Sequence, residues 1–429
     1  CIAEDAIQLT LTADWEVQVN CASGAEAAAI AGVVSVPPPE VITVKGERHD
    51  GLPIYNPQAS EYARGARLDA LKSEKLTASG LLVRDSVIVR SGPAESGTRF
   101  IRGQDYELVD LWGRIGRLPD GRIKKGDVVY VSYQHALSRI DSIFLKDDGT
   151  LKYRLGQPSA ETPEPPESAA GQRRLANIWI PGPIDRLTAD HLFPILETAY
   201  PVSTTGVSKK AERRIPRTIA KLRSGEPVRI LAWGDSVTDG AYLTDPERQR
   251  WQAQFVHRLK KRFPQANIEL ITEAWGGRST GSYLAAPEGH PHNFQQTVLN
   301  ARPDLIISEF VNDAHLNEAG VEERYGQLLA EFEKINAEWI ILTPHYVRPD
   351  WMGLDRQRDI DDDPRPYVKG LRAFAEKRQL ALADASLRYG RLWRQGIPYN
   401  TLMANCINHP DSRGLAIFAD ALMELMPRD

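Results

Sequence analysis

The stretch Val228–Gly240 reads V-R-I-L-A-W-G-D-S-V-T-D-G and decides the fold class of the second half of the chain. Its first six residues are mostly apolar, which is typical of a strand buried on both faces of a parallel sheet. The glycine, Asp235 and Ser236 that follow predict a tight turn leading into a helix. A serine on such a turn is well placed as a nucleophile, and the amino end of the helix favours negative charge. Taken alone, however, Gly-Asp-Ser is more often an ordinary turn and helix cap.

Strands and helices alternate regularly downstream of this stretch. The predicted strands cover 268–271, 305–310, 339–342 and 380–383, and the main predicted helices cover 251–263, 321–335, 367–377 and 415–425. Such alternation predicts an α/β domain with a three-layer, doubly wound parallel sheet. Binding and catalytic residues in such sheets lie in the loops after the carboxyl ends of the strands.

The first part of the chain is instead rich in β-structure. Short alternating or apolar runs separated by turn residues predict a sandwich or jelly-roll-like domain; the runs cover 7–11, 15–19, 41–44, 87–89, 128–131 and 143–145. One helix is expected there, over 59–72. We therefore expect a β-rich accessory domain over 1–155, a Pro- and Glu-rich linker and connecting segment over 156–204, and an α/β domain over 205–429.

Three later loops of the α/β domain carry candidate functional residues. The second predicted strand leads into Gly276-Gly277-Arg278-Ser279, where paired glycines let backbone N–H groups approach a ligand. Asn312 follows the third strand and has a side-chain amide that can donate to an oxyanion. His409 stands just before the last helix, where it can act as a general base. Each feature alone has an ordinary structural explanation.

Together with Ser236, these features resemble the SGNH (GDSL-type) hydrolase superfamily, over about residues 205–429. The resemblance implies a flavodoxin-like fold, a Ser236 nucleophile and a His409 base. It also implies an oxyanion hole formed by the N–H groups of Ser236 and Gly277 and the amide of Asn312. The G-G-R-S block is most similar to that of carbohydrate acetylesterases.

Two positions depart from the family pattern. The glycine that usually stands two residues before the asparagine is Phe310 here, so this loop need not follow the common backbone path. The aspartate that usually stands three residues before the histidine is Cys406. Loss of this aspartate matters, since neutralising the equivalent group in serine proteases costs roughly 10⁴ in kcat.

Three hypotheses account for the missing aspartate. Asn405 or a backbone carbonyl orients His409 through its other ring nitrogen. Alternatively, an acid arrives from elsewhere, either Asp384 at the end of the last strand or Asp411 nearby in sequence. In the third hypothesis the acid is absent and activity is low.

Length, charge balance and cysteine content exclude several classes of protein. A length of 429 residues indicates at least two domains, and 53 basic against 57 acidic residues give no electrostatic case for a nucleic-acid partner. No apolar run is long enough to span a membrane. The three cysteines, Cys1, Cys21 and Cys406, are too few for a disulfide scaffold and wrongly spaced for zinc. The implied mechanism requires no cofactor or metal.

The chain starts with Cys1, which leaves two interpretations open: a lipoprotein cleaved before a lipid-carrying cysteine, or a truncated sequence. The first would place the protein outside the cytoplasm, in the periplasm or at the cell surface. We expect a serine esterase that removes short acyl groups, with acetyl foremost, from a carbohydrate. The alternatives are a lipolytic or thioester-cleaving hydrolase, and a weakly active relative that binds glycan.

Overall fold

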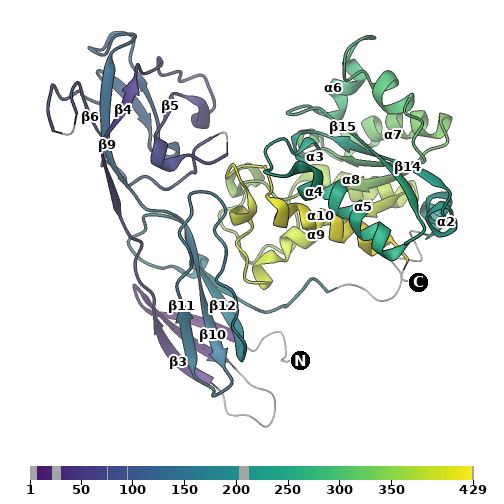
Figure 1. The fold of residues 1–429 in the computed structure, drawn as a ribbon, viewed down its shortest axis with the longest axis horizontal. Coiled ribbons are helices and arrows are strands. Elements are labelled where there is room, and N and C mark those ends of the chain that lie inside the picture. The colour runs from purple at the N-terminus through teal and green to yellow at the C-terminus, as the bar shows by residue number, and fades with distance from the viewer. Residues whose placement is uncertain (1–6, 22–29, 75, 94, 202–211, 428–429) are drawn as a thin grey trace. The chain divides into compact units, whose positions relative to one another are not determined.

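The computed structural model describes residues 7–21, 30–74, 76–93, 95–201 and 212–427, and the chain divides into two compact units (Figure 1). Unit 1 consists of Cys1–Thr198 and Trp393–Ile407, and unit 2 consists of Ala199–Leu392 and Asn408–Asp429. Cys1, on which the lipoprotein interpretation depends, lies outside the described residues. No helix in the described ranges is both long enough and apolar enough to cross a bilayer.

Unit 1 is built from antiparallel strands, as the alternating sequence pattern predicts. They are β1 (Ile7–Ala13), β2 (Glu16–Cys21), β3 (Ile30–Ser35), β4 (Ile42–Asp50), β5 (Ala66–Arg67), β6 (Ile88–Arg90), β7 (Tyr106–Val109), β8 (Arg114–Arg117), β9 (Val128–His135), β10 (Arg139–Lys146), β11 (Leu151–Arg154), β12 (Gln172–Ile180) and β13 (Leu192–Pro194). Short 3₁₀ turns connect them: η1 (Glu61–Ala63), η2 (Asp69–Leu71), η3 (Asp110–Trp112), η4 (Ala189–His191) and, in the later segment, η9 (Tyr399–Leu402).

These strands enclose two separate apolar cores. Sheet β1-β2-β3 shares a core with sheet β11-β10-β12-β13, because side chains such as Val17 and Val19 of β2 meet Ile143 of β10 and Ile178 of β12. A second core lies between sheets β4-β9-β6 and β5-β8-β7. Each pair buries the apolar face of its alternating strands, which is the principle of a sandwich.

The prediction of a helix over 59–72 is wrong. The structure has the single turns η1 and η2 there, separated by strand β5, which pairs with β8. Gly65 explains part of the difference, since a Cβ at this position would lie 2.3 Å from the carbonyl oxygen of Ile115. The backbone therefore passes too close to β8 for a helix with projecting side chains.

The segment 156–204, expected to connect two domains, contains strands β12 and β13 of unit 1. Strand β12 pairs along its whole length with β10. Its residues Leu175, Ile178 and Ile180 are buried in the first core. The Pro- and Glu-rich part before Gln172 and the stretches 181–191 and 195–201 contain no strand. A composition rich in Pro and Glu offers few apolar side chains to a core.

Unit 2 is a parallel α/β sheet with the strand order β15-β14-β16-β17-β18. Its strands are β14 (Pro227–Gly234), β15 (Asn267–Ala274), β16 (Leu305–Glu309), β17 (Glu338–Leu342) and β18 (Ala381–Ala383). Its helices are α2 (Pro216–Ser224), α3 (Ser236–Asp239), α4 (Pro246–Gln249), α5 (Trp251–Arg262), α6 (Thr280–Ala285), α7 (Glu318–Lys334), α8 (Pro366–Lys377), α9 (Ala385–Gly390) and α10 (Ser412–Leu425), with the shorter turns η5 (Gln295–Leu299), η6 (Val311–Asp313), η7 (Pro349–Met352) and η8 (Leu392–Arg394), which ends in unit 1. The predicted doubly wound sheet is confirmed.

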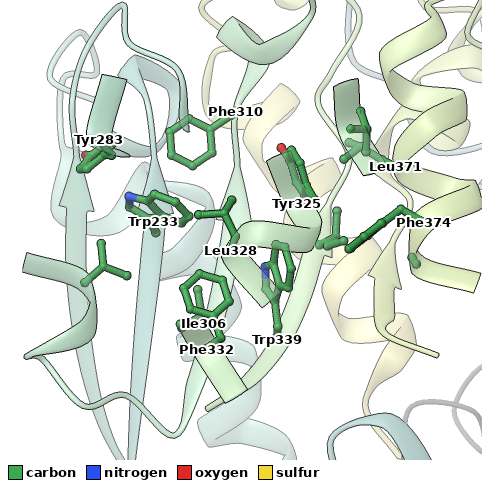
Figure 2. Packing of buried hydrophobic residues seen from close by; sticks show 14 of the residues in the cluster. Trp233, Tyr283, Ile306, Phe310, Tyr325, Leu328, Phe332, Trp339, Leu371 and Phe374 are labelled. Carbon is green, nitrogen blue, oxygen red and sulfur yellow. The ribbon is translucent and has the colours of Figure 1, made fainter. Parts of the chain in front are cut away.

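The core on one face of this sheet is aromatic. Figure 2 shows Trp233 of β14 facing Tyr283, Phe310 and Phe332, with ring centroids 5.3, 4.8 and 6.0 Å away. Alternate residues of β14 point to the other face, where α5 and α10 pack together (Figure 1). Buried apolar side chains on both faces hold the sheet rigidly, and the ends of its strands are fixed with it.

The strand order reverses between β15 and β16, which lie on opposite sides of β14. The chain therefore passes from β14 to β15 on one side, and the following strands β16, β17 and β18 lie on the other side of β14. Ligands bind at this kind of position in doubly wound sheets. The loops that carry Ser236 and Asn312 begin here.

Cys406 belongs to the core of unit 1. Its side chain is 8% exposed and packs in the second core, and Ile407 packs with Val109 and Trp112. The chain enters unit 2 at Asn408, immediately before His409. An apolar core is a costly place for a carboxylate, which gives a physical reason for cysteine where the family pattern has aspartate.

We predict that Cys406→Asp lowers the free energy of unfolding by about 2 kcal/mol or more, because it buries a charge in this core. Residue 406 has a φ of +57°, a conformation that Asp adopts more readily than Cys, so the backbone would not cause the loss. Chemical denaturation followed by fluorescence measures the effect, and Cys406→Ala is the control. Equal stability of Cys406→Asp and wild type would contradict the buried position.

Candidate active site

Ser236 is the first residue of α3 and directly follows the turn at the end of β14. The turn needs a glycine at position 234, because a Cβ there would lie 2.1 Å from Oγ1 of Thr238 and 2.5 Å from the carbonyl oxygen of Glu309. Asp235 caps the helix by accepting a hydrogen bond of 3.1 Å from the N–H of Val237. As a first-turn residue, Ser236 has a backbone N–H without a partner inside the helix.

The glycine loop after β15 lies beside this serine. The N–H of Trp275 donates to the carbonyl of Gly234 at 3.0 Å, and Arg278 closes a turn on Trp275 at 3.1 Å. A Cβ on Gly276 would lie 3.8 Å from Cβ of Ser236. Gly277 has a φ of +71°, which favours glycine. The second loop thus brings backbone N–H groups next to the first.

Asn312 lies in η6, just after β16, and is tied to the serine turn through Asp235. Its backbone N–H and its side-chain amide both donate to Oδ2 of Asp235, at 3.1 and 2.8 Å. An amide carries two hydrogens, so one is held by Asp235 and the other is left for an incoming oxygen. The carboxylate of Asp235 therefore fixes the position of Asn312 relative to Ser236.

Phe310 shows why this loop needs no glycine. Its backbone is extended, with φ −137° and ψ 94°, and its ring is buried against Trp233. The position therefore contributes an aromatic side chain to the core shown in Figure 2. The loop still delivers Asn312 to the end of the sheet.

His409 also lies next to the serine. Its Nε2 lies 3.2 Å from Oγ of Ser236, within hydrogen-bond reach of the hydroxyl proton. The ring stacks on Tyr242, with centroids 4.4 Å apart and an interplanar angle of 10°. Asp411, two residues later, caps α10 by accepting from the N–H groups of Arg413 and Gly414.

The arrangement of these loops agrees with the comparison to protein-family models. Residues 232–417 match the GDSL-like Lipase/Acylhydrolase family. The chain carries an SGNH (GDSL-type) hydrolase domain. Enzymes of this kind cleave acyl groups from esters, so the domain belongs to a family of ester hydrolases.

Solved structures similar to this chain include a two-domain esterase, CEX, active on acetylated mannans. It is 19% identical with a TM-score of 0.40, over 50% of this chain and 52% of that one. Axe2, an acetylxylan esterase from Geobacillus stearothermophilus, is 20% identical with a TM-score of 0.37, over 46% of this chain and 94% of that one. The chain thus spans about half of the two-domain esterase, and likeness at this level does not identify a substrate. A search of curated proteins found no match.

The three side chains considered for orienting His409 are Asp384, Asn405 and Asp411, and each makes local contacts in the structure. Asp384 caps α9 and receives hydrogen bonds from Thr343 and from Arg372, whose Nε lies 2.8 Å from Oδ2. In unit 1, Oδ1 of Asn405 accepts from the N–H of Ile407 at 2.9 Å. Asp411 is bound by Arg413 as well as capping α10. These contacts hold the three side chains in local turns and caps.

Buried carboxyl groups lie next to the candidate active site. Burial raises the pKa of Asp235 to about 6, although the N–H groups of Val237 and Asn312 act to lower it. Glu309, the last residue of β16, is also buried, and burial raises its pKa well above 4.5. The charge of Asp235 raises it further, whereas Arg365 acts in the opposite direction. Burial therefore favours the protonated form of Glu309 in the folded protein.

A pocket of about 540 Å³ adjoins Asn312 in unit 2. It is lined by Asn312 and Asn408, by the apolar side chains of Val347 and Met352, and by Trp351 and Arg365, among others. Trp351 is 53% exposed. Arg365 is buried and forms an ion pair with Asp363, the last of the four aspartates in the stretch D-I-D-D-D over residues 359–363. Within the described residues, no group of three or more His, Cys, Asp or Glu side chains is suited to a metal.

Sequence reasoning brought Ser236, Gly277, Asn312 and His409 to one site but did not single out Tyr242, Glu309 or Arg365. Tyr242 lies in an irregular segment between two short helices, where no periodic pattern marks a tyrosine as functional. A glutamate at the end of a buried strand, in contrast, was a readable signal, because charged residues are rarely buried without a role.

We predict that Glu309→Gln makes the hydrolase domain more stable at alkaline pH. Because the pKa of Glu309 is raised on folding, its contribution to stability is complete below about pH 4.5 and is lost as pH rises toward its folded pKa. Glutamine stays neutral, so the thermal midpoint of the variant should exceed that of wild type by about 3–5 °C for each pH unit between about 4.5 and the folded pKa of Glu309. Thermal unfolding between pH 4.5 and 8 measures the difference.

The exposed Glu323 of α7 provides the control. Glu323→Gln should show the same midpoint as wild type across this range. A Glu309→Gln variant whose midpoint follows wild type at every pH would show that Glu309 is ionised in the folded protein.

Proposed function

We propose that this SGNH hydrolase is a serine esterase that removes short acyl groups, with acetyl foremost, from a carbohydrate. The observation that carries the proposal is the 3.2 Å pair between Oγ of Ser236 and Nε2 of His409, beside the glycine turn and Asn312. A hydroxyl paired with an imidazole is the arrangement of nucleophilic acyl transfer.

The mechanism follows from these positions. His409 takes the hydroxyl proton of Ser236 as Oγ attacks the ester carbonyl and the carbonyl π electrons move to its oxygen. The resulting oxyanion accepts hydrogen bonds from the N–H groups of Ser236 and Gly277 and from the amide of Asn312. The intermediate collapses, and the alcohol leaves with the proton from His409. Water, deprotonated by His409, then attacks the acyl-enzyme and releases the carboxylic acid and Ser236.

The pocket beside Asn312 supports a carbohydrate as the alcohol part of the substrate. A half-exposed tryptophan offers a flat apolar face to a sugar ring, while Arg365 and Asn408 line the same pocket with polar groups. The apolar lining from Val347 and Met352 is the observation that favours the second candidate, a lipolytic esterase with a longer acyl chain. A polysaccharide substrate would also suit a location outside the cytoplasm.

We predict that wild-type protein hydrolyses 4-nitrophenyl acetate faster than the butyrate and octanoate esters. Ser236→Ala should lose at least about a thousandfold in kcat/KM, because the covalent route is removed. Ser224→Ala changes an exposed serine at the end of α2 and serves as the control. Equal activity of Ser236→Ala and wild type would reject the serine esterase, and a preference for octanoate would favour the lipolytic alternative.

We further predict that Trp351→Ala raises KM for peracetylated glucose by about 3–10-fold, since a stacking contact is worth about 0.5–1.5 kcal/mol. Ethyl acetate carries no ring, so its KM should stay within about twofold. Trp351→Phe keeps an aromatic face and should behave like wild type on both substrates. Acetate release by titration at constant pH measures the rates, and an equal change with both esters would contradict a sugar platform.

A further inference from the structure

The backbone is held on both sides of His409. The carbonyl of Asn408 accepts a hydrogen bond of 2.9 Å from Nε2 of His345, and the carbonyl of Pro410 accepts one of 2.8 Å from the hydroxyl of Tyr242. His345 lies in the loop after β17, whereas Tyr242 lies between α3 and α4. Two segments far apart in sequence therefore donate hydrogen bonds to the backbone carbonyls of Asn408 and Pro410, the residues immediately before and after His409.

Tyr242 also fixes the plane of the imidazole. Its ring stacks on His409 with centroids 4.4 Å apart and planes 10° from parallel. One side chain thus restrains both the backbone after His409 and the rotation of the His409 ring. The π face of a tyrosine also attracts a cation, so this stack favours the imidazolium that forms when His409 takes a proton.

The His345 donor is permanently available. Its side chain is fully buried, and a carbonyl oxygen can only accept, so Nε2 must carry the hydrogen. Burial, and then the charge of Arg365, lower the pKa of His345 well below 6.5, so the ring stays neutral. The loop is itself anchored, because Arg365 donates to the carbonyl of His345 at 2.8 Å and is paired with Asp363.

We propose that Tyr242 and His345 are positioning residues that hold His409 in register with Ser236, a role that the family assigns to an aspartate. The inference rests on the proposed function, in which His409 is the general base. Cys406, which stands at the position of that aspartate, packs its side chain in the core of unit 1. A shift of about 1 Å in a catalytic group can cost about 10²-fold in rate, so the two contacts are expected to act on kcat.

The test separates the two contacts of Tyr242 in the full-length protein. Tyr242→Phe keeps the stacked ring and removes the hydroxyl, so kcat for 4-nitrophenyl acetate should fall about 3–10-fold. Tyr242→Leu removes both contacts, and kcat should fall about 30–100-fold with KM within about threefold of wild type. Tyr389→Phe is the matched control, because it removes a buried hydroxyl that donates to the carbonyl of Gly414 in α10. Its kcat should match wild type.

The His345 contact is tested with His345→Gln and His345→Leu. Glutamine retains an N–H donor and should keep most of the activity, whereas leucine leaves the Asn408 carbonyl without this donor and should lose about 10–100-fold in kcat. Because His345 is buried, both variants are compared only after their thermal midpoints have been measured. If neither His345 variant folds, the Tyr242 series decides the proposal.

The outcomes also separate this inference from the proposed function. If Ser236→Ala abolishes hydrolysis while Tyr242→Leu retains wild-type kcat, the positioning role is overturned and the serine esterase stands. If Ser236→Ala is as active as wild type, the proposed function itself fails. Loss of kcat in Tyr242→Leu, partial loss in Tyr242→Phe and none in Tyr389→Phe would establish the positioning role.

Discussion

The site depends on one buried carboxylate. Asp235 accepts hydrogen bonds from Val237 in the serine helix and from both the backbone and the side chain of Asn312. These contacts join the loops after β14 and β16, which the reversal of strand order places side by side. Taking a carboxylate out of water is unfavourable, and burial accordingly raises its pKa to about 6. Hydrogen bonds from three N–H donors offset the cost of burying Asp235. The same bonds fix the positions of Ser236 and Asn312 relative to each other.

A second tier of contacts supports this carboxylate. Asp313, next to Asn312, accepts from the N–H and the hydroxyl of Thr280 at the start of α6, and from the hydroxyl of Tyr325 in α7. The glycine loop that precedes α6 is thereby tied to the same turn as Asn312. The loops after β14, β15 and β16 are thus connected by one network of hydrogen bonds. This network fixes the positions of the proposed oxyanion donors relative to one another.

The sequence predicted the parts of the molecule that follow from local pattern. Strand–helix alternation predicted the parallel sheet, and a residue at the carboxyl end of a parallel strand must lie near its counterparts, so Ser236, Gly277 and Asn312 were brought together in advance. The contacts of Tyr242 and His345 could not be predicted this way, because they join irregular segments whose paths depend on the complete fold. The packing of Cys406 in the second core of unit 1 could not be predicted from the sequence either. Nothing near residue 406 indicates that its side chain completes a β core.

The passage of residues 393–407 through unit 1 has a consequence for how the chain is made. Unit 1 begins to form first on the ribosome, yet its second core lacks Cys406 until almost the whole of unit 2 has been synthesised. An uninterrupted fragment starting near Ala199 would carry Cys406 and Ile407 without the cores that bury them. The last residues of unit 1 therefore become available only when the segment just before His409 has emerged.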